Sequence, residues 1–477
     1  DLNDAIRNCL RCGKCKAVCT THVPGANLLF SPRNKILAAG LIIEAFLYEE
    51  QTRRGLSVRH FDELNELADH CTICHRCVVP CPVNIDFGQV TMLIRDILRV
   101  RGQKRSAVGS RMAMAFLTIT DARSIEWLRD TVLRWGYTGQ RTAHAMARRM
   151  AWLAPKQQRP PATNHPPSLQ AQVIHLVNRP LPARLPLHSS RAFLNLDRDS
   201  HLVPIVRKAD LAEVNEAVFY FPGCGCERLF SDVALAVLAV LTHLGLHTVL
   251  PPGYLCCGFP QAANGNPQLS RQIVTSNRVL FHRLAATLGY LDIRTVLVSC
   301  GTCLGQMEQY EFNRIFPGCR VMDIHEYLME KGVRTVAADG TAGQPFLYHD
   351  PCHSPSHIHN PLQVASQLLG GEAVLSDRCC GEAGTFAVAR PDIATQARFR
   401  KEESLQAGLQ QLPTTTRPVP LMTSCPSCLQ GLSRYRSDLP VTAEFMVIEI
   451  ARRLLGRDWM PRFIEQARHG GIERILL

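Results

Sequence analysis

The chain has 477 residues, of which 46% are hydrophobic and 20 are cysteines, and its formal net charge is +12. This length and apolar content exclude a small secreted domain held by disulfides, and the first residues lack the basic and apolar regions of a signal peptide. No apolar run reaches the roughly 18 residues that a transmembrane helix needs, the nearest being residues 234–244. We therefore expect a cytoplasmic protein that is soluble or bound peripherally at the inner face of the membrane.

Two cysteine runs stand near the start of the chain, CLRCGKCKAVC from Cys9 and CTICHRCVVPC from Cys71. This spacing is typical of a ferredoxin with two 4Fe–4S clusters, in which three cysteines of each run bind one cluster and the fourth crosses to the other. Pro82 follows the second run as expected, whereas Thr20 takes that place after the first. The predicted ligands are Cys9, Cys12, Cys15 and Cys81 for one cluster and Cys71, Cys74, Cys77 and Cys19 for the other.

Zinc is the main alternative metal for these two runs. A structural zinc site needs only four ligands, so two complete four-cysteine runs favour iron and sulfur. His70 and His75 flank the second run. Because the cysteines already suffice as ligands, we expect both histidines to be exposed packing residues.

Residues 91–210 contain 20 Lys and Arg against 7 Asp and Glu, so this segment accounts for the whole net charge. Its first half, to Leu153, predicts helices with arginines on one face and Met, Ala, Leu and Trp on the other, as in residues 141–152. Its second half is punctuated by prolines and predicts an extended surface linker. Three interpretations stay open: a solvated linker whose arginines pair with an acidic partner or with the chain's own clusters, an amphipathic helix on an anionic membrane, and a nucleic-acid interface, which no binding motif supports.

Most of the remaining cysteines belong to an internal repeat. FYFPGC, CCGFP and VSCGTC recur as FLYHDPC, CCGEAG and TSCPSC, and equivalent cysteines stand 128, 123 and 125 positions apart. In each copy an apolar run ends at a cysteine and segments of helical period follow, such as residues 232–244, 270–288 and 393–407. This alternation predicts two parallel α/β units with the cysteines at the carboxyl ends of strands, where ligands bind.

Local backbone chemistry explains these cysteine patterns. A C-x2-C pair directly after a strand places its thiolates at the first turn of a helix, whose free N–H groups stabilise an anionic cluster. After the vicinal pairs, we expect Gly258 and Gly381 to take positive φ, so that adjacent sulfurs can face one site. Cys226 and Cys319 have no counterpart in the repeat and are predicted to be buried small side chains.

The C…CCG…C-x2-C unit, complete in both copies, resembles the cysteine-rich (CCG) domain of three proteins: heterodisulfide reductase B subunits, the glycolate oxidase iron–sulfur subunit and the anaerobic glycerol-3-phosphate dehydrogenase C subunit. The last two also resemble this chain in placing a two-cluster ferredoxin module before two such units. The resemblance covers the ferredoxin region to about residue 100 and the chain from about residue 215 onward. It implies one or two further iron–sulfur clusters, held by Cys224, Cys256, Cys257, Cys300 and Cys303 in the first unit and by Cys352, Cys379, Cys380, Cys425 and Cys428 in the second.

Two roles stay open for the HDPCH sequence around Cys352. His349, Asp350 and His353 can donate hydrogen bonds to cluster sulfur and so tune its potential. Alternatively they form a satisfied turn in which Asp350 caps the next helix.

These patterns predict a multidomain α and α/β protein. A helical two-cluster ferredoxin domain is expected at residues 1–100, a basic helical segment with a proline-rich linker at 101–214, and two CCG units at 215–340 and 341–477. The sequence contains no dinucleotide-binding glycine motif, phosphate loop or nucleophile with a partnered base, so no catalytic residue is predicted.

The resemblance implies an iron–sulfur electron-transfer module. It would take electrons from a FAD-linked 2-hydroxyacid dehydrogenase, of the type that acts on D-lactate, glycolate or 2-hydroxyglutarate, and pass them to quinone or another acceptor. FAD would lie on a partner or, since the chain begins at Asp1 rather than Met, on an N-terminal part of a longer fused polypeptide. Two alternatives stay open: disulfide reduction at a cysteine-rich cluster, as in heterodisulfide reductases, and a zinc-stapled interaction scaffold.

Overall fold

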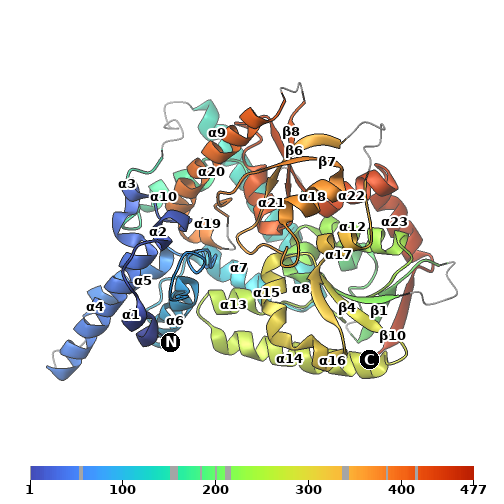
Figure 1. Cartoon of the computed structure of the whole chain (residues 1–477), viewed down its shortest axis with the longest axis horizontal. Coiled ribbons are helices and arrows are strands. Elements are labelled where there is room, and N and C mark those ends of the chain that lie inside the picture. The colour runs from blue at the N-terminus through green and yellow to red at the C-terminus, as the bar shows by residue number, and fades with distance from the viewer. Residues whose placement is uncertain are drawn as a thin grey trace.

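The computed structural model describes residues 2–52, 57–150, 159–182, 185–198, 201–209, 216–335, 343–382, 385–413 and 417–477. A helical part formed by the start of the chain lies beside a larger part that contains two β-sheets covered by helices (Figure 1). The predicted fold class, a helical N-terminal part followed by parallel α/β units, is confirmed.

The N-terminal part consists of helices around a small core, with the cysteine runs in the turns between them. α4 begins after Ser31, whose hydroxyl accepts a hydrogen bond from the Asn34 N–H, and α6 begins after Asp86, whose carboxylate accepts one from Gly88. The apolar faces of α4, α5 and α6 meet in one core against which cysteines of both runs pack. The elements are α1 (Leu2–Asn8), α2 (Cys15–Val18), α3 (Pro24–Asn27), η1 (Leu28–Phe30), α4 (Pro32–Gln51), α5 (Val58–Asp69) and α6 (Phe87–Val100).

The basic segment is more regular than the sequence suggests. Helices occupy its first half as predicted, although residues 151–153 of the expected helix lie outside the described residues. Two helices and a strand also lie within the predicted linker, because apolar side chains such as Leu194 and Leu196 are buried in the main core. None of the described helices combines the length and apolar character that crossing a bilayer requires. The elements are α7 (Val108–Thr118), α8 (Ala122–Leu128), η2 (Arg129–Leu133), α9 (Arg134–Arg149), α10 (Leu169–Val177) and α11 (Ser190–Phe193).

Within the described residues the first sheet has six strands in the order β10-β1-β3-β2-β4-β5. β2, β3, β4 and β5 are parallel, while β1 is antiparallel to both of its neighbours. β1 precedes residue 215 and β10 lies at the end of the second unit, so this sheet includes strands from outside residues 215–340. The elements are β1 (Leu202–Val206), β2 (Ala217–Phe221), η3 (Gly225–Leu229), α12 (Ser231–His243), β3 (His247–Val249), α13 (Phe259–Ala263), α14 (Pro267–Thr287), β4 (Ile293–Val298), α15 (Gly301–Met307), η4 (Glu308–Tyr310), α16 (Phe312–Ile315), β5 (Arg320–Asp323) and α17 (Ile324–Glu330).

The second sheet repeats the parallel part of the first. Its strands are parallel in the order β7-β6-β8-β9, which matches β3-β2-β4-β5 position for position. The duplication predicted from the cysteine spacing is therefore a duplication of topology. The elements are β6 (Gly343–His349), α18 (Pro361–Leu369), β7 (Gly371–Leu375), α19 (Phe386–Ala389), α20 (Pro391–Gln411), β8 (Val419–Thr423), α21 (Pro426–Ser433), β9 (Val441–Phe445), α22 (Met446–Leu455), α23 (Trp459–Arg468) and β10 (Ile472–Leu476).

One hydrophobic core joins the two sheets. On β2, Val218 and Tyr220 face this shared core, whereas Phe219 and Phe221 face α14, α15 and α16 on the other side of the first sheet. α12, α17, α18 and α22 contribute to the shared core, and α20 and α21 cover the opposite face of the second sheet. The central strands β2, β4, β6 and β8 are thus mostly buried on both faces, which explains why they read as continuous apolar runs.

Buried charged side chains attach the N-terminal part to the second unit. The guanidinium of Arg390 lies 2.9 Å from the carboxylate of Glu66 on α5 and 2.9 Å from that of Asp392, and it also donates to the Thr163 carbonyl oxygen. All three charged side chains are at least 94% buried. Arg95 of α6 donates to the Ala263 carbonyl oxygen and so connects the same part to the first unit. The three modules therefore form one packed body.

We predict that Arg390→Met destabilises this packing. Removing the guanidinium leaves Glu66 and Asp392 buried without its charge, a change that typically costs ~3–5 kcal/mol. The midpoint of thermal unfolding, measured calorimetrically, should fall. Arg294→Met is the matched control, because the Arg294–Asp292 pair is exposed and should contribute less than ~1 kcal/mol. Equal midpoints for the two variants would contradict the structural role of Arg390.

Candidate metal centres

A solvent-open hollow in the N-terminal part brings together the first predicted ligand set. Cys9, Cys12, Cys15 and the crossing Cys81 all line it, together with Cys77 of the second run. The first run reaches the hollow from between α1 and α2, and Cys81 reaches it from the turn before α6. Cys12 is exposed, so this hollow is open to solvent at that side chain.

The second cysteine run forms a tight turn at the predicted site of the other cluster. Ile73 and His75 adopt positive φ, and the Ile73 N–H donates to the Cys71 sulfur at 3.4 Å. Cys77 is buried, and burial raises the pKa of its thiol to about 12. Cys19 is joined to this run through its neighbour Thr20, whose hydroxyl lies 3.8 Å from the Cys74 sulfur. Four thiolates around one iron–sulfur cluster are compatible with this arrangement.

Five thiols converge at the carboxyl ends of β2, β3 and β4 in the first unit. Cys224 hydrogen-bonds to Cys256, and Cys257 contacts Cys256 and Cys303. These two contacts lower the pKa of Cys257 to about 6, Cys256 contributing most. Cys300 stands at the N-cap of α15 and Cys303 in its first turn, as the C-x2-C pattern predicts. From β2, the chain continues to β3 on one side of the sheet and later to β4 on the other side. The five thiols lie at this switch point, which is a usual binding position in such folds.

The second unit gathers its five thiols in the same way. Cys352 contacts Cys379, and the sulfur of Cys380 lies 3.5 Å from that of Cys428. Cys425 is the N-cap of α21 and contacts Cys428. Gly258 and Gly381 have φ of +95° and +78°, so the expected positive φ after each vicinal pair is confirmed.

The thiol sets also touch one another. Cys74 of the N-terminal part is in hydrogen-bond contact with Cys352 of the second unit, and this contact lowers the pKa of Cys74 to about 6. Cys425 of the second unit contacts Cys300 of the first. The units approach so closely there that a Cβ on Gly301 would lie 1.9 Å from the His353 carbonyl oxygen. The sequence contains no signal for these contacts between modules.

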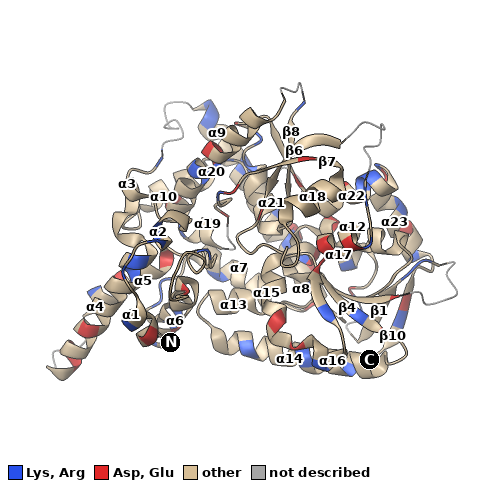
Figure 2. Ribbon diagram, in the orientation of Figure 1, with Lys and Arg blue, Asp and Glu red and all other residues tan. Residues whose placement is uncertain are grey.

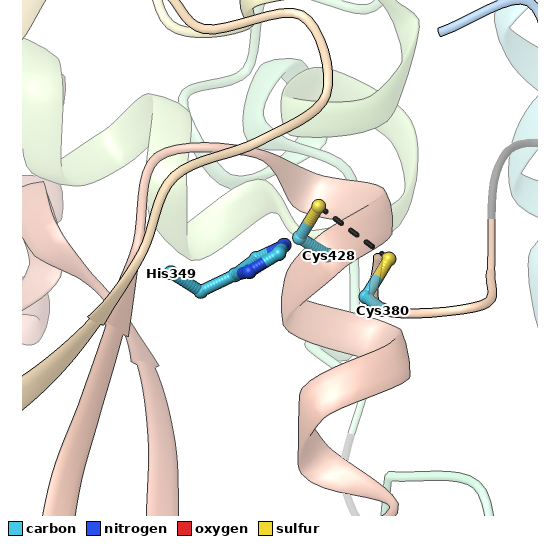
Figure 3. A group of neighbouring side chains, drawn as sticks. All are labelled: His349, Cys380 and Cys428. Carbon is cyan, nitrogen blue, oxygen red and sulfur yellow. Dashed lines mark hydrogen bonds between the residues drawn. The ribbon is translucent and has the colours of Figure 1, made fainter. Parts of the chain in front are cut away.

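His349, Cys380 and Cys428 form a buried group whose ligand atoms all lie within 4.8 Å of one another. His349 comes from the end of β6, Cys380 from the loop after β7 and Cys428 from α21, and their side chains point toward one another (Figure 3). Asp350 accepts a hydrogen bond from Ser354, whereas Asn360 caps the next helix, so the helix-cap role considered for Asp350 is wrong. His353 instead faces the Ile73 carbonyl oxygen.

The expectation for His70 was wrong. This histidine is fully buried, because its ring stacks on Phe30 at 3.9 Å and its nitrogens face the carbonyl oxygens of Glu66 and Thr163. His75 is partly exposed and pairs with Asp86. Both histidines therefore have structural partners in the N-terminal part.

Lys401 is the residue of this region that sequence reasoning missed. It lies in α20, where an amphipathic pattern would place a lysine in solvent, yet its side chain is completely buried. Burial lowers the pKa of Lys401 to about 8, and the nearby thiols of the second unit oppose that shift. Comparing the repeats could have singled it out, since Lys401 takes the place of Asn277 in the equivalent helix.

All 20 cysteines lie in the described part of the chain and are free thiols. Cys226 is buried, as predicted, and Cys319 is partly buried. The other 18 belong to the four groups above, and their soft sulfur ligands are compatible with iron–sulfur clusters.

The chain matches three family models. Residues 5–85 match a 4Fe-4S dicluster domain, residues 218–308 and 346–433 match a cysteine-rich domain (CCG), and residues 433–477 match a domain of unknown function (DUF3400). The chain thus contains a 4Fe–4S dicluster domain followed by two cysteine-rich domains. No solved structure matches it.

Curated relatives align over different shares of the chain. The probable glycolate oxidase iron-sulfur subunit of Bacillus subtilis is 22% identical over 88% of this chain and 87% of its own. The B subunit of the fumarate reductase (CoM/CoB) of Methanothermobacter marburgensis is 28% identical over 39% of this chain and 37% of its own. Lactate utilization protein A of an Exiguobacterium species is 25% identical over 41% of this chain and 83% of its own.

We predict that the two ferredoxin-like sets exchange their fourth ligands. Cys81→Ser should perturb the cluster in the hollow of Cys9, and Cys19→Ser should perturb the cluster of Cys71, Cys74 and Cys77. Iron analysis and electron paramagnetic resonance of the reduced protein would measure both effects. Cys319→Ser is the control, because its thiol lies outside the four sets. Damage by each substitution to the cluster of its own run would contradict the crossed assignment.

Proposed function

We propose that this homologue of glycolate oxidase iron–sulfur subunits is an electron relay between a FAD-linked 2-hydroxyacid dehydrogenase and quinone or another acceptor. The names of the relatives support an oxidase partner, since they describe an iron–sulfur subunit of glycolate oxidase and a lactate utilization protein. The bound clusters would supply one-electron transfer, and the four cysteine sets would be their ligands.

The observation that carries this proposal is the unbroken succession of thiol contacts through the molecule. It runs from Cys74 to Cys352, through the second unit to Cys425, and from there to Cys300 of the first unit. A protein that bound metals only for stability would not need its metal sites in contact with one another. A protein that moves electrons does, because each transfer must cover a short distance within a dry interior.

The electron balance fits such a relay. Oxidation of a 2-hydroxy acid to its 2-oxo acid releases two electrons and two protons, which reduce the flavin of the partner. A flavin on such a partner would supply these electrons one at a time, with its protons going to solvent, and the cysteine sets of this chain would hold the clusters that accept the electrons. Reduction of a quinone to a quinol then takes up two electrons and two protons.

The hollow around Cys12 is the natural port for a redox partner. Cys12 is exposed, and the neighbouring Leu10 and Val83 expose 63% and 38% of their surface. Arg11 and Lys14 are exposed beside them. An apolar centre with basic neighbours fits a partner that presents an acidic surface around its own redox group.

Peripheral contact with an anionic membrane is supported by the long helix formed by α8, η2 and α9. Trp127 and Trp135 expose 62% and 74% of their surface, and Met146 exposes 63%. The helix ends in the exposed Arg148 and Arg149, and basic residues at this end are visible in Figure 2. Exposed tryptophan beside arginine is typical of helices that lie on a lipid surface.

We predict that the anaerobically purified protein is brown, contains at least about eight irons, and accepts electrons from its co-purified flavoprotein when a 2-hydroxy acid is added. Absorbance bleaching and metal analysis would measure this. A colourless protein with stoichiometric zinc would support a scaffold instead. Disulfide reduction with an artificial donor and no flavoprotein would support the catalytic alternative.

We predict that the full-length protein co-sediments with phosphatidylserine-containing vesicles and that salt weakens this binding. Substituting both Trp127 and Trp135 by serine should weaken binding roughly tenfold, since apolar insertion is then lost. Tyr290→Ser is the matched control, because Tyr290 is an equally exposed aromatic residue (65%) on the first unit. Identical binding by the control and the double variant would argue against this face.

A further inference from the structure

The two repeats differ at one buried pair of positions beside the thiols. β2 and β6 are equivalent strands, and Phe221 at the end of β2 corresponds to His349 at the end of β6. α14 and α20 are equivalent helices of 21 residues that both begin at a proline. Counting from that proline, Asn277 corresponds to Lys401.

Packing supports this correspondence. The Cβ position of Gly258 faces Ser270 and Val274, and that of Gly381 faces Ala394 and Arg398, each pair at the same places in its helix. The first unit therefore has a neutral amide and a phenyl ring where the second has an ammonium and an imidazole. Asn277 donates to the Cys256 carbonyl oxygen and to the Tyr310 hydroxyl, and has no role toward Phe221.

The contacts of Lys401 determine how His349 is protonated. The Lys401 ammonium donates to the carbonyl oxygen of Ser376 at 2.8 Å and to its hydroxyl at 2.7 Å, and it lies 3.0 Å from Nδ1 of His349. Nδ1 also lies 3.2 Å from the Ser376 carbonyl oxygen, but that oxygen already accepts from Lys401. An ammonium has no lone pair, so a proton on Nδ1 would meet the ammonium's own protons, and Nδ1 therefore accepts the third hydrogen bond of Lys401. The ring proton of the neutral imidazole then resides on Nε2.

Nε2 of His349 points toward the metal-binding thiols. It is buried and has no hydrogen-bond partner within the described residues, and the ring faces Cys380 and Cys428 (Figure 3). A protonated nitrogen cannot bind iron, but it can donate to sulfur. The orphaned N–H thus has one class of acceptor in reach, the sulfur atoms of a cluster held by these cysteines.

We infer that His349 and Lys401 are positioning residues that give the cluster of the second unit a higher reduction potential than that of the first. Reduction adds negative charge, which the N–H···S bond and the buried ammonium stabilise. Arg76 of the N-terminal part adds a further cation beside Cys352 and Cys379. Glu382, the acidic residue next to the vicinal pair, is balanced by Arg398 and Arg434.

Because of this difference in potential, an electron in the relay occupies the cluster of the second unit preferentially, whichever way electrons flow. An electron that arrives through Cys74 meets the second unit first and is held there, while the first unit remains oxidised until a further electron arrives. The inference rests on the proposed function, because it requires an iron–sulfur cluster at the second unit.

The test is potentiometric titration of the anaerobic full-length protein, followed by electron paramagnetic resonance. Lys401→Asn and His349→Phe install the residues of the first unit. Each should make the equilibrium constant for reduction of one cluster at least tenfold less favourable, which lowers its midpoint potential by about 59 mV for one electron. Lys401→Arg should largely preserve the potential. Lys208→Asn removes a charge at an exposed position and is the control.

The possible results separate the inference from the function on which it rests. Unchanged iron content with unchanged potentials in both variants would overturn the inference and leave the relay intact. If a Cys379→Ala, Cys428→Ala variant instead kept its full iron content, the second unit would hold no cluster. That result would refute the proposed relay itself.

A measurement on the wild-type protein keeps the inference testable if a variant fails to fold. With 15N-labelled histidine, pulsed resonance spectra should show the weak nitrogen coupling of an N–H···S bond. The strong coupling of a directly bound nitrogen would make His349 a ligand and would overturn the inference.

Discussion

The close approach of the two α/β units, carboxyl ends of strands toward each other, is the constraint on which the rest of this structure depends. It brings Cys300 and Cys425 into contact and allows no side chain at Gly301. Two thiol sets that would be separate in isolated domains thereby become neighbours. α12, which lies between the sheets, is almost entirely apolar and is buried nearly from end to end.

The attachment of the N-terminal part follows a different physical logic. Its contacts with the α/β units are mainly charged and directional, such as Arg390 with Glu66 and the Arg76 side chain with the Asp377 carbonyl oxygen. Directional contacts fix orientation more strictly than apolar packing does. Orientation matters here because Cys74 must meet Cys352, and a small rotation of the module would separate the two sulfurs.

Local patterns predicted the parts of the structure that depend on local chemistry. The cysteine runs, the strands that end at cysteines, the helix starts at Cys300 and Cys425 and the positive φ of Gly258 are all determined within a few residues. The contacts between modules, the burial of Lys401 and the position of His70 depend instead on which surfaces dock. A single sequence has no period or spacing that reports docking, and the burial of a lysine even opposes the usual pattern.

The pairing of β1 with β10 links residues 202–206 to residues 472–476. While the chain is being synthesised, the first sheet can form its parallel strands early, but the outer edge of β1 stays open until the second unit has been made. An open strand edge attracts other strands. In a newly made chain, the edge of β1 therefore has to be protected from pairing with other strands until β10 has been synthesised. A chaperone or rapid completion of the fold would provide that protection.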